Sequence, residues 1–193
     1  MEKLFADPSL KSNAAGRGEI IIVDDSRTNL SVMGLRLTRM GYATVLVDDP
    51  IAALDLVHAR RFDLMILDMT MPLMSGISVL GELRATPATR HLPVLMITSR
   101  SDPGAAIDAL GAGADDHVVK PFDFDMLGAR IERLLDRARI MEGLRRANAA
   151  LDACIAHRAV ELSEVRAELA DAEAAHRSLQ QQFQALSETT WRG

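Results

Sequence analysis

Short apolar runs alternate with amphipathic segments along about the first 140 of the 193 residues. Each amphipathic segment repeats its apolar residues at the three-to-four-residue spacing of a helix that faces a core. The first of them opens with Ser26, a good helix N-cap, and stops at Gly41. The five runs, each with the segment that follows it, are EIIIVDD and SRTNLSVMGLRLTRMG, ATVLV and DDPIAALDLVHAR, DLMILD and SGISVLGELRAT, LPVLMIT and SDPGAAIDALGAG, and DDHVVK and FDFDMLGARIERLLDRAR.

This alternation predicts the fold class. Continuous apolar runs suit strands that are buried on both faces, as in parallel sheets, and the helices between them supply the crossover connections. Right-handed crossovers then place helices on both faces of the sheet. We therefore expect an α/β fold over residues 18–139, a doubly wound (βα)5 domain with a five-stranded parallel sheet.

Composition narrows the class of protein. The formal charge of −5 gives no electrostatic reason to expect nucleic-acid binding. The single cysteine, Cys154, excludes an internal disulfide framework and fits a reducing cytosol. No apolar run approaches the roughly 20 residues that span a membrane, and residues 1–17 lack the apolar run of a signal peptide. We expect a soluble cytoplasmic protein in which residues 1–17 form a disordered leader.

Polar residues close four of the five predicted strands. Ligands bind beyond the carboxyl ends of the strands in open parallel sheets, so these side chains are expected to meet at one edge. They are Asp24, Asp25, Asp68, Thr98 and Lys120. Three crowded carboxylates repel one another unless a cation lies among them, and Mg²⁺ prefers carboxylates, waters and phosphoryl oxygens. The pattern therefore predicts a Mg²⁺ site.

The same group of side chains indicates a chemistry. With the acids of the first strand on the metal, Asp68 is left as a carboxylate nucleophile that faces a phosphoryl donor. Lys120 adds positive charge for the phosphoryl oxygens, and the Thr98 hydroxyl hydrogen-bonds the group once it has arrived. The backbone carbonyl of Thr70 is close enough in sequence to complete the metal's coordination. Pro72 ends the strand and turns the chain away from the acid.

The segments IIIVDDS, MILDMTMPLMSG, VLMITS and VVKPF occur in this order and spacing, and on them the chain resembles the receiver domain of two-component response regulators over about residues 19–139. The resemblance implies a flavodoxin-like fold and transient phosphorylation of Asp68 by a histidine kinase or a histidine phosphotransfer protein. The implied site residues are, for Mg²⁺, Asp24, Asp25, Asp68 and the Thr70 carbonyl, and, for phosphoryl contact and switching, Thr98 and Lys120.

Two positions vary from the pattern of that family. His117 stands where receivers usually carry a Tyr or Phe that switches rotamer, and its protonation would couple the switch to pH. The alternative is a partly exposed histidine with no special role. Arg100, two residues after Thr98, stands where the family tunes how fast the phosphoryl group is lost; the alternative is a solvated arginine.

The chain after residue 139 carries a heptad pattern. With Asn148 at position a, eleven of fourteen a and d positions are apolar, and neither Pro nor Gly interrupts residues 144–186. This predicts a coiled-coil helix over residues 140–187, continuous with the last receiver helix, and a flexible tail over 188–193. Asn148 favours a parallel homodimer, whereas Arg158 and His176 weaken the seam. The predicted seam residues are Asn148, Leu151, Ile155, Leu162, Val165, Leu169, Leu179 and Phe183.

Several readings of the whole chain stay open. The first is a phosphorylation-controlled receiver, not an enzyme beyond autodephosphorylation, whose dimeric coiled coil acts on an unknown downstream protein. The second is the front part of a larger signalling enzyme, such as a cyclic-dinucleotide enzyme or a kinase. A constitutive dimer scaffold is a third. The helix alternatively folds back on its own receiver or binds a different protein. A haloacid-dehalogenase-type hydrolase needs a second acid where Thr70 stands.

Overall fold

The structure is a computed structural model that describes residues 17–99 and 104–190; within the last helix it leaves out the side chains of residues 171, 175 and 182–190. The chain divides into two units, Met1–Ile140 and Met141–Gly193. The leader predicted over residues 1–17 lies, apart from Arg17, outside the described residues, as does the end of the predicted tail.

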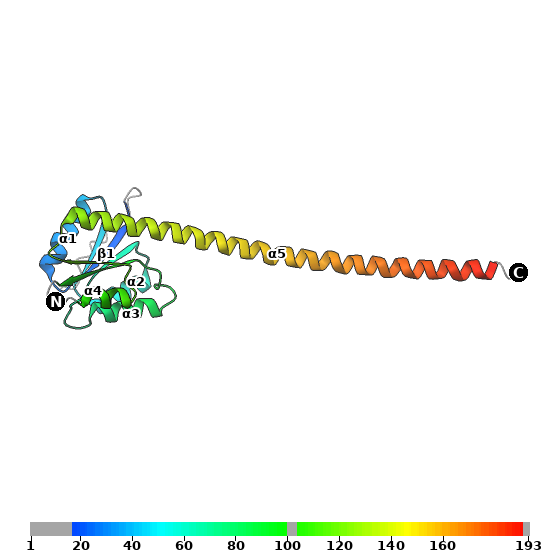
Figure 1. Ribbon diagram of the computed structural model, residues 1–193, viewed down its shortest axis with the longest axis horizontal. Helices are drawn as coiled ribbons and strands as arrows, with labels where there is room; N and C mark the ends of the chain where they lie inside the picture. Colours follow the sequence, from blue (N-terminus) through cyan, green and yellow to red (C-terminus); the bar gives the residue numbers. More distant parts are fainter. Residues whose placement is uncertain (1–16, 100–103, 191–193) are drawn as a thin grey trace. The chain divides into compact units, whose positions relative to one another are not determined.

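The first unit is the predicted α/β domain (Figure 1). Its five strands form one parallel sheet in the order β2-β1-β3-β4-β5, which confirms the doubly wound topology. The strands are β1 (Glu19–Val23), β2 (Ala43–Val47), β3 (Leu64–Asp68), β4 (Val94–Ser99) and β5 (Asp116–Lys120). The helices are α1 (Arg27–Arg39), α2 (Pro50–Ala59), α3 (Gly76–Ala85), α4 (Ala105–Gly111) and α5 (Phe124–Thr190).

Each face of the sheet packs against its own set of helices. Alternate residues of β1 belong to different cores: Ile20 and Ile22 pack with residues of α1 and α5, while Ile21 and Val23 pack with residues of α2, α3 and α4. The two helix layers are visible in Figure 1. Burial on both faces explains why β1, β3 and β4 consist mainly of apolar residues, with a polar side chain at or directly after the carboxyl end of each.

Side-chain caps set where three helices begin. Ser26 caps α1, where its hydroxyl accepts from the Asn29 N–H, and Ser75 caps α3 in the same way. Asp49 caps α2, where its carboxylate accepts from the Ile51 N–H at 2.9 Å. Each cap satisfies a helix N–H that has no partner within the helix. The chain therefore enters a helix within a few residues of the end of β1 and of β2, and these short connections fix the carboxyl ends of both strands.

Helix α5 runs from Phe124 to Thr190 and includes the heptad segment. Gly143 lies within this helix. The apolar seam residues of the second unit are exposed in the single chain, namely Leu151, Ile155, Leu162, Val165, Leu169 and Leu179. Asn148 is exposed as well, and the side chain of Phe183 lies outside the described residues.

Among the described helices, none combines the length and the hydropathy needed to cross a bilayer.

Candidate functional site

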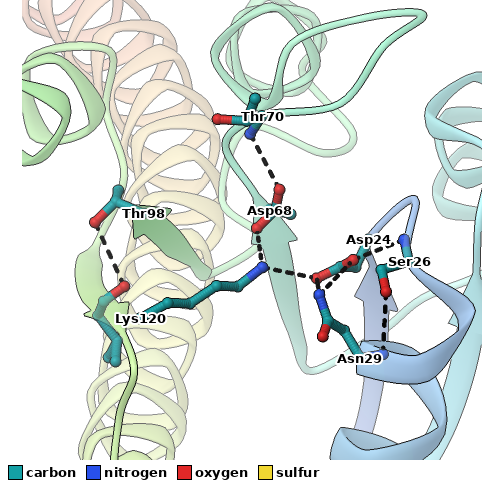
Figure 2. A network of polar contacts seen from close by, with 8 residues as sticks. Asp24, Ser26, Asn29, Asp68, Thr70, Thr98 and Lys120 are labelled. Carbon is teal, nitrogen blue, oxygen red and sulfur yellow. Dashed lines mark hydrogen bonds and ion pairs between the residues drawn. The ribbon is translucent and has the colours of Figure 1, made fainter. Parts of the chain in front are cut away.

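The carboxyl ends of three strands bring two acids and one lysine into direct contact (Figure 2). The ammonium of Lys120, the last residue of β5, lies 2.6 Å from Asp68 Oδ1 and 3.0 Å from Asp24 Oδ2. Asp68 is the last residue of β3, and Asp24 directly follows β1. Side chains 96 residues apart in sequence thus share one ion-pair network. They meet because the parallel topology brings the carboxyl ends of the strands to the same edge of the sheet.

Asp68 is held by the loop that follows it as well as by Lys120. The Thr70 N–H donates to Asp68 Oδ2 at 3.1 Å, and the Gly76 N–H donates to the Met69 carbonyl at 2.9 Å. A Cβ atom on Gly76 would collide with the backbone carbonyl oxygen of Asp68. Glycine is therefore required at position 76 by close packing, because the loop folds back onto the end of β3 at that point.

Thr98 is buried at the end of β4, one strand away from Asp68. Its hydroxyl donates a long hydrogen bond of 3.5 Å to the Val118 carbonyl of β5. The parallel register places Asp68 opposite Ile97 and Thr98 opposite Val119. The structure therefore puts Thr98 at the same edge as Asp68 and Lys120, with its hydroxyl bonded to β5 (Figure 2).

Asp24 has a donor partner that sequence reasoning missed. The side-chain amide nitrogen of Asn29 lies 3.1 Å from each of its carboxylate oxygens, and the Ser26 N–H donates to Oδ1 at 2.8 Å (Figure 2). The sequence signal that was available for Asn29 is its place three residues after the N-cap Ser26, on the first turn of α1. Asp24 is only 1% exposed, whereas its neighbour Asp25 is exposed.

Burial and the neighbouring charges perturb the acid and the base in this network. Burial raises the pKa of Asp68, and the Asp24 carboxylate adds to the rise, against the opposing hydrogen bond and charge of Lys120. Burial alone would lower the pKa of Lys120, but its hydrogen bonds and charge interactions with Asp68 and Asp24 outweigh burial and raise it. Lys120 is therefore a firmly charged cation placed between two carboxylates.

The donor atoms at this edge are those that Mg²⁺ takes. Asp24 and Asp68 supply carboxylate oxygens that already bind one cation, the Lys120 ammonium, and the exposed Asp25 adds a third carboxylate next in sequence. In the described part of the chain, no three Asp, Glu, His or Cys side chains lie together as a ready-made metal site. Mg²⁺ does not need three, because it keeps several waters and uses one or two carboxylates. The residues present fit the ion.

Of the two positions that vary from the family pattern, the structure describes His117 but not Arg100. His117 lies in β5 and is half-buried; its Nδ1 is buried without a hydrogen-bond partner in the described chain. Arg100 lies outside the described residues.

The neighbour of His117, Asp116, was missed by sequence reasoning. Its buried carboxylate accepts from Arg130 at 2.8 Å and from Arg133 at 2.7 Å, which ties β5 to the start of α5.

Comparison with known proteins assigns the family. The family model of the response regulator receiver domain matches residues 20–132, a range that includes Asp24, Asp68 and Lys120. The chain belongs to the response regulator receiver domain family. It is 38% identical over 120 residues to the chemotaxis protein CheY of Pseudomonas aeruginosa, where the match covers 62% of this chain and 97% of that protein. It is also 38% identical over 124 residues to the response regulator MprA of Mycobacterium sp. (strain KMS), with 64% of this chain covered.

Solved receiver structures have the same fold. The signal receiver domain of a histidine kinase from Syntrophus aciditrophicus is 36% identical, with a TM-score of 0.58, and the match covers 62% of this chain and 90% of that one. The receiver domain of a sensor histidine kinase from Pseudomonas aeruginosa, solved with a magnesium ion coordinated in its active-site cleft, is 31% identical, with a TM-score of 0.59 and coverages of 63% and 99%. The chain spans only 53% of the length of MprA.

Proposed function

We propose that Asp68 is the phosphoacceptor of this receiver and takes its phosphoryl group from a histidine kinase or a histidine phosphotransfer protein. The observation that carries the proposal is the Lys120 ammonium, which lies within hydrogen-bond distance of both Asp68 and Asp24. A carboxylate attacks a phosphoryl donor best where fixed positive charge offsets the charge of the incoming oxygens. Lys120 supplies that charge at the atom that forms the new bond.

Mg²⁺ fits this proposal as the cofactor. Asp24, Asp25 and Asp68 would hold it with their carboxylates, and Thr70 with its backbone carbonyl. When bound, the ion supplies further neutralisation of phosphoryl oxygen charge. The magnesium ion in the cleft of the Pseudomonas aeruginosa receiver domain supports this assignment. The other steps belong to the chain: the phosphorus–nitrogen bond of the donor breaks as an Asp68 oxygen bonds the phosphorus.

Lys120 and Thr98 are proposed to contact the phosphoryl group once it is on Asp68. Lys120 keeps an ion pair with the carboxylates of the site and contacts a phosphoryl oxygen. The Thr98 hydroxyl gives up its long bond to the Val118 carbonyl and donates to the phosphoryl group instead, which favours a second arrangement of β4 and β5. His117, three residues before Lys120 on the same strand, changes its exposure with that arrangement. Arg100 is proposed to slow loss of the group by shielding it from water.

A mass measurement tests the phosphoacceptor. The full chain is incubated with acetyl phosphate and MgCl₂, and its intact mass is recorded over time. We expect one added phosphoryl group on the natural chain and on Asp108→Asn, which removes an exposed acid of α4, and none on Asp68→Asn. Omission of MgCl₂ should also prevent labelling. Labelling of Asp68→Asn at the same rate would overturn the assignment.

The output is proposed to be a parallel homodimer formed by the heptad segment of α5, which acts through protein contacts. The support is the row of exposed apolar residues at a and d positions, because a long helix with such a stripe is unstable alone in water. A disulfide test checks orientation. In a Cys154→Ser background, Leu151→Cys at a d position should cross-link two chains under mild oxidation, since parallel in-register helices bring equivalent d positions together. Asp152→Cys, one position away, should cross-link far less.

Coupling between the two events has its own test. Beryllofluoride with Mg²⁺ imitates an aspartyl phosphate, and we expect it to change the dimer dissociation constant or hydrogen exchange along residues 120–160. No change in either would count against coupling while leaving the phosphoacceptor intact.

A second candidate is the receiver and linker portion of a larger signalling protein, such as a cyclic-dinucleotide enzyme or a kinase. It is favoured by one observation: the chain spans about half the length of MprA. The reading frame after the codon for Gly193 decides between them, because a further domain encoded there would make α5 a linker, and a stop codon would leave α5 as the output itself.

A further inference from the structure

Asn29 binds the carboxylate of Asp24 with a geometry that leaves that carboxylate little freedom. Its side-chain nitrogen is 3.1 Å from both Oδ1 and Oδ2 (Figure 2). The same residue is fixed at its backbone, since its N–H donates to the Ser26 hydroxyl that caps α1. The amide is thus presented by the first turn of a helix, which is a more rigid support than a loop.

Three donor groups bind the Asp24 carboxylate. Oδ1 accepts from the Ser26 N–H and from the Asn29 amide, and Oδ2 accepts from the Asn29 amide and from the Lys120 ammonium. An ionised carboxylate has about four acceptor positions in total. Asp24 is buried, so water does not compete for these positions from outside. Rotation of the carboxylate toward a cation would break at least one bond to Asn29.

We propose that Asn29 is a positioning residue that sets the divalent-cation selectivity of the site by limiting how far the Asp24 carboxylate turns, so that Asp24 offers an ion a single oxygen, the one that Lys120 binds here. This inference rests on the proposed Mg²⁺ site. Ca²⁺ takes six to eight oxygen ligands and gains from each added carboxylate, whereas Mg²⁺ is content with one or two carboxylates and several waters. A carboxylate that the amide restrains therefore costs Ca²⁺ more binding free energy than Mg²⁺.

Calorimetric titration tests this inference without reference to phosphorylation. MgCl₂ and CaCl₂ are each titrated into the unsubstituted 193-residue chain and into Asn29→Ala, Asn29→Leu and Asn29→Gln, at one pH and ionic strength. Thr28→Ala is the matched control, because Thr28 is an exposed neighbour on the same helical turn. Asn29→Leu keeps the bulk of the side chain and removes its donors. Thermal unfolding of each variant checks that it folds.

The ratio of the Ca²⁺ dissociation constant to the Mg²⁺ dissociation constant is the deciding quantity. We expect Asn29→Ala and Asn29→Leu to lower it about tenfold, which corresponds to the lower end of the change in metal affinity that follows loss of an outer partner, acting on one of the two ions. Thr28→Ala should leave it unchanged, and Asn29→Gln should restore part of it. An unchanged ratio in the Ala and Leu variants, including equal weakening of both ions, overturns the inference while the natural chain still binds Mg²⁺. A natural chain that binds neither ion overturns the proposed metal site as well.

Discussion

The Lys120 ammonium lies 2.6 Å from Asp68 Oδ1 while it also lies 3.0 Å from Asp24 Oδ2, so one cation balances two buried carboxylates from different strands. Neither acid has a second lysine or arginine in its described ion pairs. Removing one partner from a buried charge pair is costly, because the remaining charge stays desolvated and unpaired. The stability of the receiver therefore depends on Lys120 unless another cation takes its place.

Lys120→Met should destabilise the receiver by about 2–3 kcal/mol in the presence of EDTA, and MgCl₂ should recover a large part of that loss. The recovery follows because an ion that binds only the folded state stabilises it by mass action. Urea unfolding with EDTA and with MgCl₂ measures both quantities. The same loss in both conditions would show that Mg²⁺ does not bind at the carboxylates that Lys120 balances.

The fold and the main contacts at the site were predictable for a physical reason. A parallel sheet buries both faces of each strand, so polar residues at strand ends, such as Asp68 and Lys120, stand out from the apolar runs before them. The topology then brings those ends to one edge whatever the sequence distance between them. The convergence of Asp24, Asp68 and Lys120 required no knowledge of side-chain geometry.

The contacts of Asn29 and Asp116 were not predictable on the same basis. Asn29 is half-buried on the first turn of α1, where an asparagine has many uses, and only the direction of its amide reveals Asp24 as its partner. Asp116 binds Arg130 and Arg133, which stand among several arginines of α5 that share the same periodicity. Choosing among them requires the angle between β5 and α5, which a linear pattern does not contain.

Asp116 should make stability depend on pH in a defined direction. Burial alone would raise the pKa of this carboxyl, but its hydrogen bonds to Arg130 and Arg133 and to the His117 N–H prevail and lower it below the ordinary value of 3.8. An acid whose pKa is lowered in the folded state stabilises that state above its ordinary pKa, and the contribution is lost as pH falls through the folded pKa. Asp116→Asn should therefore cost about 1–2 kcal/mol at pH 7, since both arginines are partly exposed.

Urea unfolding of the natural chain and Asp116→Asn across the acid range checks this. The difference between the two proteins should be constant near neutral pH and should shrink as pH falls below 3.8. Asp55→Asn, at an exposed acid in the middle of α2, is the surface control and should cost little stability at neutral pH. A difference that grows toward acid pH would reverse the sign of the argument.

Two glycines of α3 offer a matched pair for the loop after Asp68. Gly76→Ala places a methyl group against the Asp68 carbonyl, so we expect a loss of about 3 kcal/mol and slower labelling by acetyl phosphate. Gly81→Ala meets no atom within 4 Å, and in a helix interior it should stabilise by up to about 1 kcal/mol. Thermal or urea unfolding of both variants measures the contrast. Equal effects would mean that the loop does not need its close approach to β3.

The last prediction concerns the heptad register of α5. Leu162 and Val160 are about equally exposed in the single chain but take different heptad positions. In the single chain Leu162 is 57% exposed and Val160 is 58% exposed, so neither contributes to a core there. In the proposed parallel dimer Leu162 is an a residue that enters the seam, whereas Val160 is an f residue that stays in solvent. Leu162→Ala should raise the dimer dissociation constant at least about tenfold, because the buried leucine is lost from both chains.

Val160→Ala should leave the constant unchanged in the same sedimentation equilibrium experiment. Alanine is the best helix former, so neither substitution weakens the helix itself, and any difference reports the seam. If both variants weaken the dimer equally, the interface does not follow the heptad register. If neither does, the exposed stripe of α5 serves a different partner or packs on the receiver, and the homodimer must be abandoned while the phosphoacceptor assignment stands.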